Sequence, residues 1–299
     1  MKKNRVLPIL LIFLFCTISG AEEIENLVDN KFYNKINEIS QNLSNNISNS
    51  LKDNERIKYL DFSINFQEHY KPTIEVQSVN KLSESEESVF FNQTNLLSHD
   101  GDTTVNLGLG KRELIYNDSL LLGSNIFFDY QFDESHLRNG LGLEAISKSL
   151  DLRANYYNAI SGFKTTDEGR EKALDGYDLQ LDYHIKDLEN LKTDLFIQTF
   201  EWENPNSSFK EKGEKAGIIS QIGNLAFEVG YLNDNKNNDG FFGSLKLLIK
   251  LGDNKKDNVS KIAKKDKKQN LKDKFYIPVK RENKIKVVKL SSGVKIGGF

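Results

Sequence analysis

The sequence predicts an all-β fold, a 12-stranded antiparallel transmembrane β-barrel of the outer membrane with a short N-terminal helical leader and a C-terminal linker. Three observations predict it. Apolar and polar residues alternate from Tyr59 to Gly252, which is the period of a strand with two different faces. An export signal opens the chain. The connections between the predicted strands alternate between long and short, as in outer-membrane barrels.

Residues 1–21 have the features of a secretory signal peptide. Basic residues precede an apolar stretch at 6–18, and small residues at 19–21 suit cleavage before Glu22. The apolar stretch is too short for a lasting membrane helix. The only cysteine, Cys16, lies within it, and a lipoprotein anchor, the alternative, would need a small residue where Phe15 stands. The mature chain is therefore expected to form no disulfide and to carry out no thiolate chemistry.

Residues 22–56 are predicted to form a periplasmic leader. Apolar residues recur there at helical spacing in an Asn-rich segment, and they are Ile36, Ile39, Leu43, Ile47 and Leu51. One amphipathic helix is expected. Both a partner-binding helix and a loosely ordered leader fit the pattern.

The barrel is predicted to cover residues 57–252. Twelve candidate strands lie at 57–70, 72–80, 88–98, 102–114, 120–132, 136–147, 149–160, 174–186, 190–203, 213–222, 224–233 and 239–252. An even number of antiparallel strands brings both ends of the barrel to the same side.

The connections predict which side faces the periplasm. Those after the fourth, sixth, eighth and tenth strands are short, whereas those after the seventh, ninth and eleventh are long and polar, at 161–173, 204–212 and 234–238. A longer stretch at 81–87 and a tight corner at Lys71 and Pro72 are the exceptions. Outer-membrane barrels carry long loops outside and short turns in the periplasm, so the N-terminus is expected to be periplasmic. A soluble β-sandwich, the alternative fold, gives no reason for this alternation.

The two faces of the strands predict lipid outside and a polar lumen inside. Apolar residues such as Leu107, Leu109, Leu141 and Leu143 fall on the outward face. Charged groups of both signs on the other face indicate a wet or polar-filled lumen, because a dry core would not tolerate them. The lumen-facing residues expected to contact the linker are Asp61, Asn106, Asn125, Asp129, Arg138, Glu144, Arg153, Asp178, Asp182, Glu228, Lys246 and Lys250.

Glycines at positions 108, 110, 140 and 142 also fall on the inward face. They either relieve crowding where the strands coil or leave room for a segment inside the lumen.

Charge is divided unevenly along the chain. Residues 253–299 contain 15 Lys and Arg against 5 Asp and Glu, a net charge of +10, which leaves −12 on the remainder. At roughly 3.3 Å per residue this basic linker could span a membrane several times over. Attraction to the acidic wall would hold it in the lumen, whereas a solvated basic tail is the alternative. A lumenal helix at 257–274 is compatible with the sequence, as is disorder.

Several stretches resemble the membrane domain of the intimin/invasin family, the inverse autotransporters. They are NLGLGKR (106–112), GSNIFFD (123–129), GLGLE (140–144), LRANYY (152–157) with SGF (161–163), and GYD (176–178). They follow the family's order near its spacing, and the similarity covers roughly residues 57–290. The stretch RENKIKVV (281–288) looks like the strand that follows the barrel in that family.

The resemblance implies a barrel that exports its own C-terminal passenger, associated with surface display and cell adhesion. The chain after the last strand would re-enter the lumen and emerge outside. Passengers of the family are usually stacked Ig-like domains, and we expect none here, because no such repeat precedes Phe299. A truncated adhesin and a barrel with its own role both remain open. A passive outer-membrane pore or structural barrel is the alternative function.

No catalytic, cofactor or metal site is expected. The four histidines, His69, His99, His136 and His184, do not show ligand spacing, and no nucleophile or nucleotide motif is present. The expected partners are outer-membrane lipid, periplasmic chaperones, the barrel-assembly machinery and the chain's own linker in the lumen. Assembly would read a signal in the last strand, at 241–251. A homodimer is left open, and the exported basic tail lacks the interleaved aromatic residues of a nucleic-acid-binding segment.

Overall fold

A computed structural model describes residues 30–51, 55–166, 169–188, 191–251 and 270–290. The predicted signal peptide and most of the predicted helix at 257–274 lie outside these ranges. The described strands are β1 Ile57–Gln67, β2 Thr73–Glu84, β3 Ser88–His99, β4 Asp102–Ile115, β5 Leu120–Gln131, β6 His136–Ile146, β7 Leu150–Ala159, β8 Lys164–Thr166, β9 Gly169–Ala173, β10 Asp175–Leu188, β11 Leu191–Glu203, β12 Lys210–Ile222, β13 Leu225–Asp234, β14 Gly240–Lys250 and β15 Val287–Leu290. The helices are α3 Asn30–Leu51 and a 3₁₀ turn, η1, at Leu271–Lys274.

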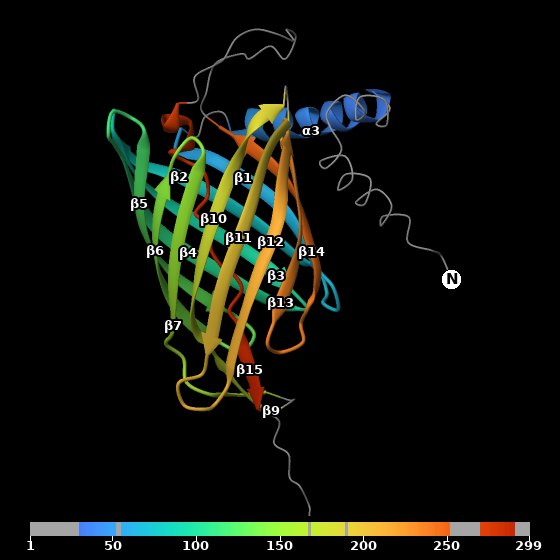
Figure 1. The fold of residues 1–299 in the computed structure, drawn as a ribbon, viewed down its shortest axis with the longest axis vertical. Coiled ribbons are helices and arrows are strands. Elements are labelled where there is room, and N and C mark those ends of the chain that lie inside the picture. The colour runs from blue at the N-terminus through green and yellow to red at the C-terminus, as the bar shows by residue number, and fades with distance from the viewer. Residues whose placement is uncertain (1–29, 52–54, 167–168, 189–190, 252–269, 291–299) are drawn as a thin grey trace, which may run out of the picture.

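Twelve of these strands form a closed antiparallel barrel, which confirms the predicted fold class (Figure 1). The order around the barrel is β1-β14-β13-β12-β11-β10-β7-β6-β5-β4-β3-β2, and β1 pairs with both β2 and β14. Closure pairs the backbone of every barrel strand with two neighbours, which is the condition for a sheet to cross lipid.

The two ends of the barrel differ in their connections. Short turns such as 116–119, 147–149 and 223–224 close one end, hereafter the turn end. The opposite end, hereafter the loop end, carries the connections at 160–174, 204–209 and 235–239. The backbone at Tyr116, Asn117 and Asp118 has positive φ, as a tight turn between strands often requires.

One connection at the loop end differs from the prediction. The sequence predicts a long polar loop over 161–173, but β8 and β9 form a hairpin there, and β15 joins it in a three-stranded sheet. The strand β8 has only three residues, Lys-Thr-Thr, so it is too short to show an alternating pattern. The third strand of this sheet, β15, pairs with β9 and lies more than a hundred residues further along the chain.

The helix α3 packs against β14 near the turn end, and Figure 1 shows it extending sideways from there, at the upper right of the view. Ile249 of β14 pairs with Leu60 on the outward face and is nevertheless fully buried. Among the residues the structure describes, no helix combines the length and apolar character needed to cross a membrane.

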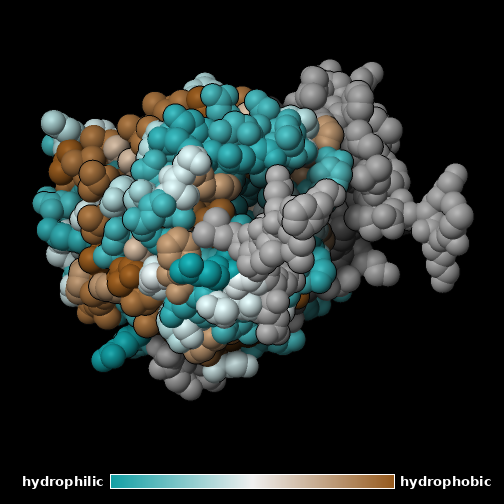
Figure 2. Space-filling model, turned by 90° about the horizontal axis from the view of Figure 1, so that it is seen from below, coloured by the Kyte–Doolittle hydropathy of each residue, from teal (hydrophilic) through white to brown (hydrophobic). Residues whose placement is uncertain are grey.

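The outer face of the barrel is apolar. Four leucines predicted to face outward are each at least 46% exposed there, namely Leu107, Leu109, Leu141 and Leu143. Figure 2 shows apolar residues gathered on the flank of the barrel, at the left of the view. In water such a surface would be unfavourable, whereas in lipid it is the expected exterior of a transmembrane barrel. The barrel therefore has the exterior of a membrane-spanning protein.

Candidate functional site

The lumen of the barrel holds a segment of the chain's own C-terminal region. Residues 270–290, hereafter the lumenal segment, begin with η1 at the turn end and run in extended form through the barrel (Figure 1). They end in β15, which pairs with β9 at the loop end, where the Leu174 amide also donates to the Lys286 carbonyl at 2.9 Å. The segment therefore joins the two ends of the barrel.

Arg112 of β4 anchors the segment at the turn end. Alternation places this side chain inward, and it is fully buried. Its Nη1 donates to the carbonyls of Phe275 at 2.7 Å and Ile277 at 2.6 Å, while its Nε donates to Glu144 at 2.6 Å. The Phe91 ring lies 4.6 Å from the guanidinium. Because the acceptors in the segment are backbone carbonyls, this anchor fixes the position of the segment's backbone and does not depend on the identity of those side chains.

A second anchor lies at mid-lumen around Asp129. Arg281 of the lumenal segment donates two hydrogen bonds of 2.7 Å to this carboxylate, and Arg138 donates a third from the wall at 2.7 Å. All three side chains are at most 2% exposed. Arg138 also donates to the carbonyls of Glu282 and Lys284. A bidentate arginine pair fixes orientation as well as position, so the register of the segment is set here.

Aromatic rings complete this second anchor. The Arg281 guanidinium lies 4.2 Å from the Phe127 ring centroid and the Arg138 guanidinium 4.5 Å from that of Tyr157. The Tyr157 hydroxyl accepts a hydrogen bond from the Glu282 amide and donates one to Asp178. Desolvated cation–π contacts contribute about 2 kcal/mol each, so the rings support the buried charges.

Lysines of the segment form further ion pairs with the wall. Lys280 lies 3.0 Å from Asp182, which also pairs with Arg153. Nearer the turn end, Lys274 lies 3.2 Å from Asp151 and hydrogen-bonds His184. The basic segment therefore meets acidic groups along its length, as the division of charge in the sequence suggests.

Apolar clusters surround the segment at both ends of the lumen. At the turn end, Leu271, Phe275 and Val279 are buried with wall residues that include Phe91 and Phe127. Toward the loop end, Val288 is buried in a cluster with Trp202 and Tyr157 among others. The burial of these apolar side chains stabilises the docked segment through the hydrophobic effect, in addition to the polar anchors.

Glycines make room for the rings that face the segment. A Cβ at Gly108 would lie 2.3 Å from Phe127, and one at Gly110 would lie 2.4 Å from Phe91. A Cβ at Gly140 would lie 3.1 Å from Arg281 itself. Gly108 and Gly110 therefore prevent a clash with the neighbouring aromatic rings, and Gly140 leaves room for Arg281 of the segment.

Gly108→Ala is expected to destabilise the barrel by about 1–3 kcal/mol, because the added methyl group must displace the buried Phe127 ring under Arg281. Gly162→Ala is the matched control, since no atom lies within 4 Å of its added Cβ. The measurement is the temperature at which half of the protein loses its folded gel mobility. An unchanged temperature for Gly108→Ala would contradict the tight packing.

His136 fastens the β8–β9 hairpin to the barrel at the loop end. Its Nε2 lies 2.8 Å from Glu171 of β9, its Nδ1 lies 3.0 Å from the Ser161 hydroxyl, and its side chain is fully buried. Since β9 pairs with β15, these contacts hold the strand at which the segment leaves the lumen.

The predicted lumen-facing residues fall into three groups. Asn106, Asp129, Arg138 and Asp182 contact the lumenal segment directly.

Three others lie one contact away, and a fourth, Asn125, is buried in the wall. Glu144 holds Arg112, Arg153 pairs with Asp182 and Asp151, and Asp178 accepts from Asn155 and Tyr157. Asn125 is buried against Gly142, at a position where an added Cβ would meet its amide.

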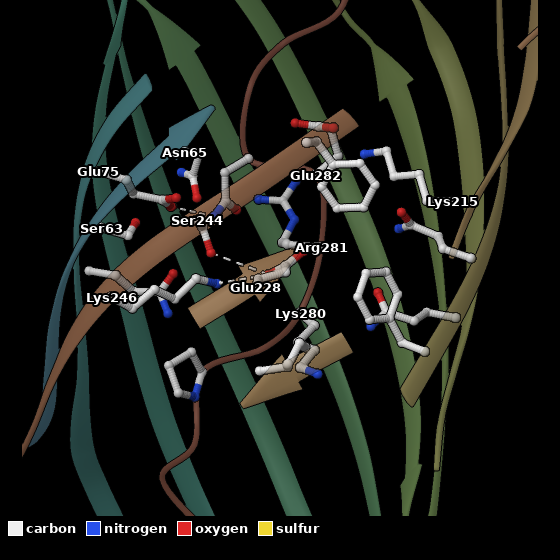
Figure 3. Close-up of a pocket in the computed structure, with 18 of the residues that line it drawn as sticks. Ser63, Asn65, Glu75, Lys215, Glu228, Ser244, Lys246, Lys280, Arg281 and Glu282 are labelled. Carbon is white, nitrogen blue, oxygen red and sulfur yellow. Dashed lines mark hydrogen bonds and ion pairs between the residues drawn. The ribbon is translucent and has the colours of Figure 1, made fainter. Parts of the chain in front are cut away.

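Of the remaining four, Asp61, Glu228 and Lys246 have their described contacts with other residues of the wall. Asp61 accepts from Gln77 on the neighbouring strand, and Glu228 pairs with Lys246 at 3.7 Å (Figure 3). Lys250 is exposed at the turn end.

Sequence reasoning missed several direct contacts of the segment. They are Gln93, Arg112, Asp151, Asn155 and Tyr157 on the wall. The alternation of the strands places each of these side chains on the lumen face, as it does the predicted residues, so the sequence already indicated that they point inward. What the pattern could not show is which part of the circular wall the segment would follow.

The histidines have structural partners. His184 contacts Asp151 and Asp194, and His99 contacts Thr73. Within the described ranges, no cluster of three or more His, Cys, Asp or Glu side chains is arranged to hold a metal ion.

Known proteins are similar to this chain in sequence and in fold. The family model "Inverse autotransporter, beta-domain" matches residues 17–283. The chain is 28% identical over 131 residues to a putative attaching and effacing protein homolog of Escherichia coli K12, which covers 43% of this chain and 44% of that protein. It is 32% identical over 85 residues to the inverse autotransporter adhesin YeeJ of E. coli K12, and this alignment covers 28% of this chain and 4% of YeeJ. The aligned part therefore spans less than half of each relative.

The fold also has a solved counterpart. A chain from work on the in-meso crystallization of membrane proteins superposes with a TM-score of 0.63 at 18% identity, covering 77% of this chain and 98% of that chain. At this identity the likeness concerns the fold.

Proposed function

Because the chain belongs to the inverse autotransporter β-domain family, we propose that its outer-membrane barrel is a translocator and anchor that carries the chain after β14 to the cell surface for display and adhesion. The observation that carries this proposal is the continuous path of the lumenal segment from the turn end to the loop end. Arg112 and Arg138 bind backbone carbonyls along this path, so the lumen recognises a polypeptide as such.

The same contacts account for anchoring. Once Arg281 reaches Asp129 and β15 pairs with β9, the segment is held by buried ion pairs and by a strand pairing at the exit. Pulling the segment outward would leave Asp129 and Asp182 with fewer cations in a buried site, which is costly. A force on the displayed chain is therefore borne by the barrel.

A passive pore with the tail left in the periplasm was the alternative function. The position of residues 270–290 inside the lumen does not support it. We also propose that the barrel has no catalytic activity. Outer-membrane lipid, the barrel-assembly machinery and periplasmic chaperones are its proposed partners, and dimer formation remains an alternative.

Export predicts that the chain beyond β15 is outside the cell. An epitope inserted after Ser292 should bind antibody on intact cells. A matched epitope in the 116–119 turn, at the opposite end of the barrel, should bind only after the outer membrane is permeabilised. Export is wrong if the Ser292 epitope also needs permeabilisation while the barrel shows folded gel mobility.

A further inference from the structure

The helix α3 lies outside the barrel wall, beside a strand that closes the barrel. It packs against β14, which pairs with β1 in the closed sheet. The outward-facing residues of β14 become less exposed toward the turn end, since Phe241 is 61% exposed and Leu245 41%, whereas Ile249 is fully buried. At this end of β14 the helix therefore takes the place that lipid has along the rest of the outer wall.

This contact lies at the rim of the turn end. Leu225, the first residue of β13, pairs with Leu247, so Ile249 lies beyond the start of the neighbouring strand. Tyrosines mark the same end of the barrel. Tyr116 is 75% exposed in a turn, and Tyr183, which pairs with the first residue of β7, is 52% exposed. Because tyrosine is enriched where a membrane meets water, the rim and the helix beside it lie at the level of that interface.

From the rim the helix runs away from the barrel along the membrane. Figure 1 shows α3 crossing the direction of the barrel's long axis, with its N-terminal part, in the deeper blue, beyond the barrel wall. Its C-terminal end stays near the barrel, because β1 begins at Ile57, soon after Leu51. A helix that leaves the rim in this direction lies along the surface of the leaflet at the turn end.

The sequence divides α3 into an apolar stripe and a polar face. Five apolar positions recur at intervals of three or four residues and so share one side of the helix, and they are Phe32, Ile36, Ile39, Leu43 and Ile47. Every other position of the helix except Tyr33 and Leu51 is polar. Lys31 and Lys35, in the part beyond the barrel, supply positive charge for lipid phosphates. A helix with this division is typical of a membrane surface and not of a membrane core.

The barrel covers a different side of the helix from the one that carries the stripe. Ser44 is buried, and in an α-helix it lies about 100° round from Leu43. Asn46 and Ser50 follow Leu43 by one and two turns on its own side, and both are exposed. Ile47, between these two sides, is half-buried. The stripe therefore faces away from the barrel wall, and of the surroundings at the rim, lipid stabilises it and water does not.

We infer that α3 is a membrane-surface helix that binds the phospholipids of the periplasmic leaflet beside β14. Its apolar stripe enters the boundary between headgroups and acyl chains, and its polar face stays in water. This binding goes beyond export and anchoring, since it needs neither the lumenal segment nor an exported cargo. It attaches the turn-end rim to the membrane by a segment that is not part of the transmembrane wall.

The test places single spin labels on the two faces of α3 in the full chain. Ile36→Cys lies on the stripe, and Asn34→Cys is its matched partner on the polar face, each combined with Cys16→Ser to remove the only native thiol. The protein is reconstituted in vesicles of phosphatidylethanolamine and phosphatidylglycerol. The label at residue 36 should collide several-fold more often with lipid-soluble oxygen than with a water-soluble nickel complex, and the label at residue 34 should show the opposite preference.

Three results would overturn the inference in a barrel with folded gel mobility. A preference for the nickel complex at both positions would place the helix in water. A preference for oxygen at both would mean that the polar face is not in water. Spin–spin broadening at residue 36 that fades when unlabelled chain is added would show that a second copy covers the stripe.

A double variant tests whether the stripe holds the helix on lipid. A label at Phe32→Cys should prefer oxygen, and Ile36→Asn with Ile39→Asn should shift that preference to the nickel complex, because the apolar stripe is interrupted. Asn34→Ser with Asn37→Ser, on the polar face, is the control and should leave the label unchanged. An unchanged label in the stripe variant would contradict lipid binding. A water-exposed helix in a chain whose Ser292 epitope still reaches the surface would leave the export proposal standing.

Discussion

Deletion of residues 270–290 should raise the single-channel conductance several-fold. The segment is bonded to β2–β7 and β10 inside the lumen, and its removal exposes the charged groups that it now covers, including Asp129 and Asp182. These charges can be hydrated in an open lumen, so the barrel itself should remain folded. The measurement compares conductance in planar bilayers at equal salt for the full chain and the deletion variant.

Two controls make this result interpretable. Deletion of residues 291–299 leaves the lumenal segment in place and should leave the conductance as it is in the full chain. Heat-modifiable gel mobility reports whether each variant still forms the barrel. If the deletion of 270–290 produces a folded barrel with unchanged conductance, the segment does not fill the lumen.

Asp129→Asn should cause the largest loss of stability of any single side-chain change in the lumen, about 3–5 kcal/mol. Asp129 pairs with two buried guanidinium groups, those of Arg138 and Arg281, and accepts a hydrogen bond from Asn106. Without its charge, both arginines remain buried beside each other, and their repulsion adds to the lost hydrogen bonds. The measurement is the free energy of unfolding in denaturant.

Arg281→Met removes the other partner of the Asp129–Arg281 ion pair and is the matched comparison for Asp129→Asn. It leaves Asp129 with Arg138 and keeps an apolar side chain over Phe127, so it should cost less than Asp129→Asn. Adding Asp129→Asn to the deletion of 270–290 should also cost less than Asp129→Asn in the full chain, because one buried cation has gone. Equal costs in the two backgrounds would show that Asp129 does not hold the segment.

Much of the barrel could be predicted from alternation alone. Each of the twelve barrel strands overlaps a predicted range, because a lipid-facing and a lumen-facing side impose a period of two that is visible in one sequence. Phe128 and Asp129, adjacent in the chain, face opposite sides as expected. The hairpin of β8 and β9 was missed because β8 has only three residues and because β15, which pairs with β9, lies far along the chain.

The contacts inside the lumen were less predictable. Alternation indicates that Asp182 and Glu228 both point inward, but only Asp182 meets the segment. The difference lies in their positions around the barrel, which depend on the closure of β1 on β14 and on the side that the segment follows. Lys280 and Asp182 lie 98 residues apart in the chain, and no local pattern connects them.

The most direct test of the central claim is a cross-link between the lumenal segment and the wall. Lys280→Cys combined with Asp182→Cys places two thiols where an ion pair of 3.0 Å now stands. Glu228→Cys with Ser244→Cys, partners on adjacent wall strands, is the positive control for a folded barrel. A short bifunctional thiol reagent should link both pairs in isolated outer membranes. If it links the wall pair and leaves residues 182 and 280 unlinked, the segment does not thread the lumen.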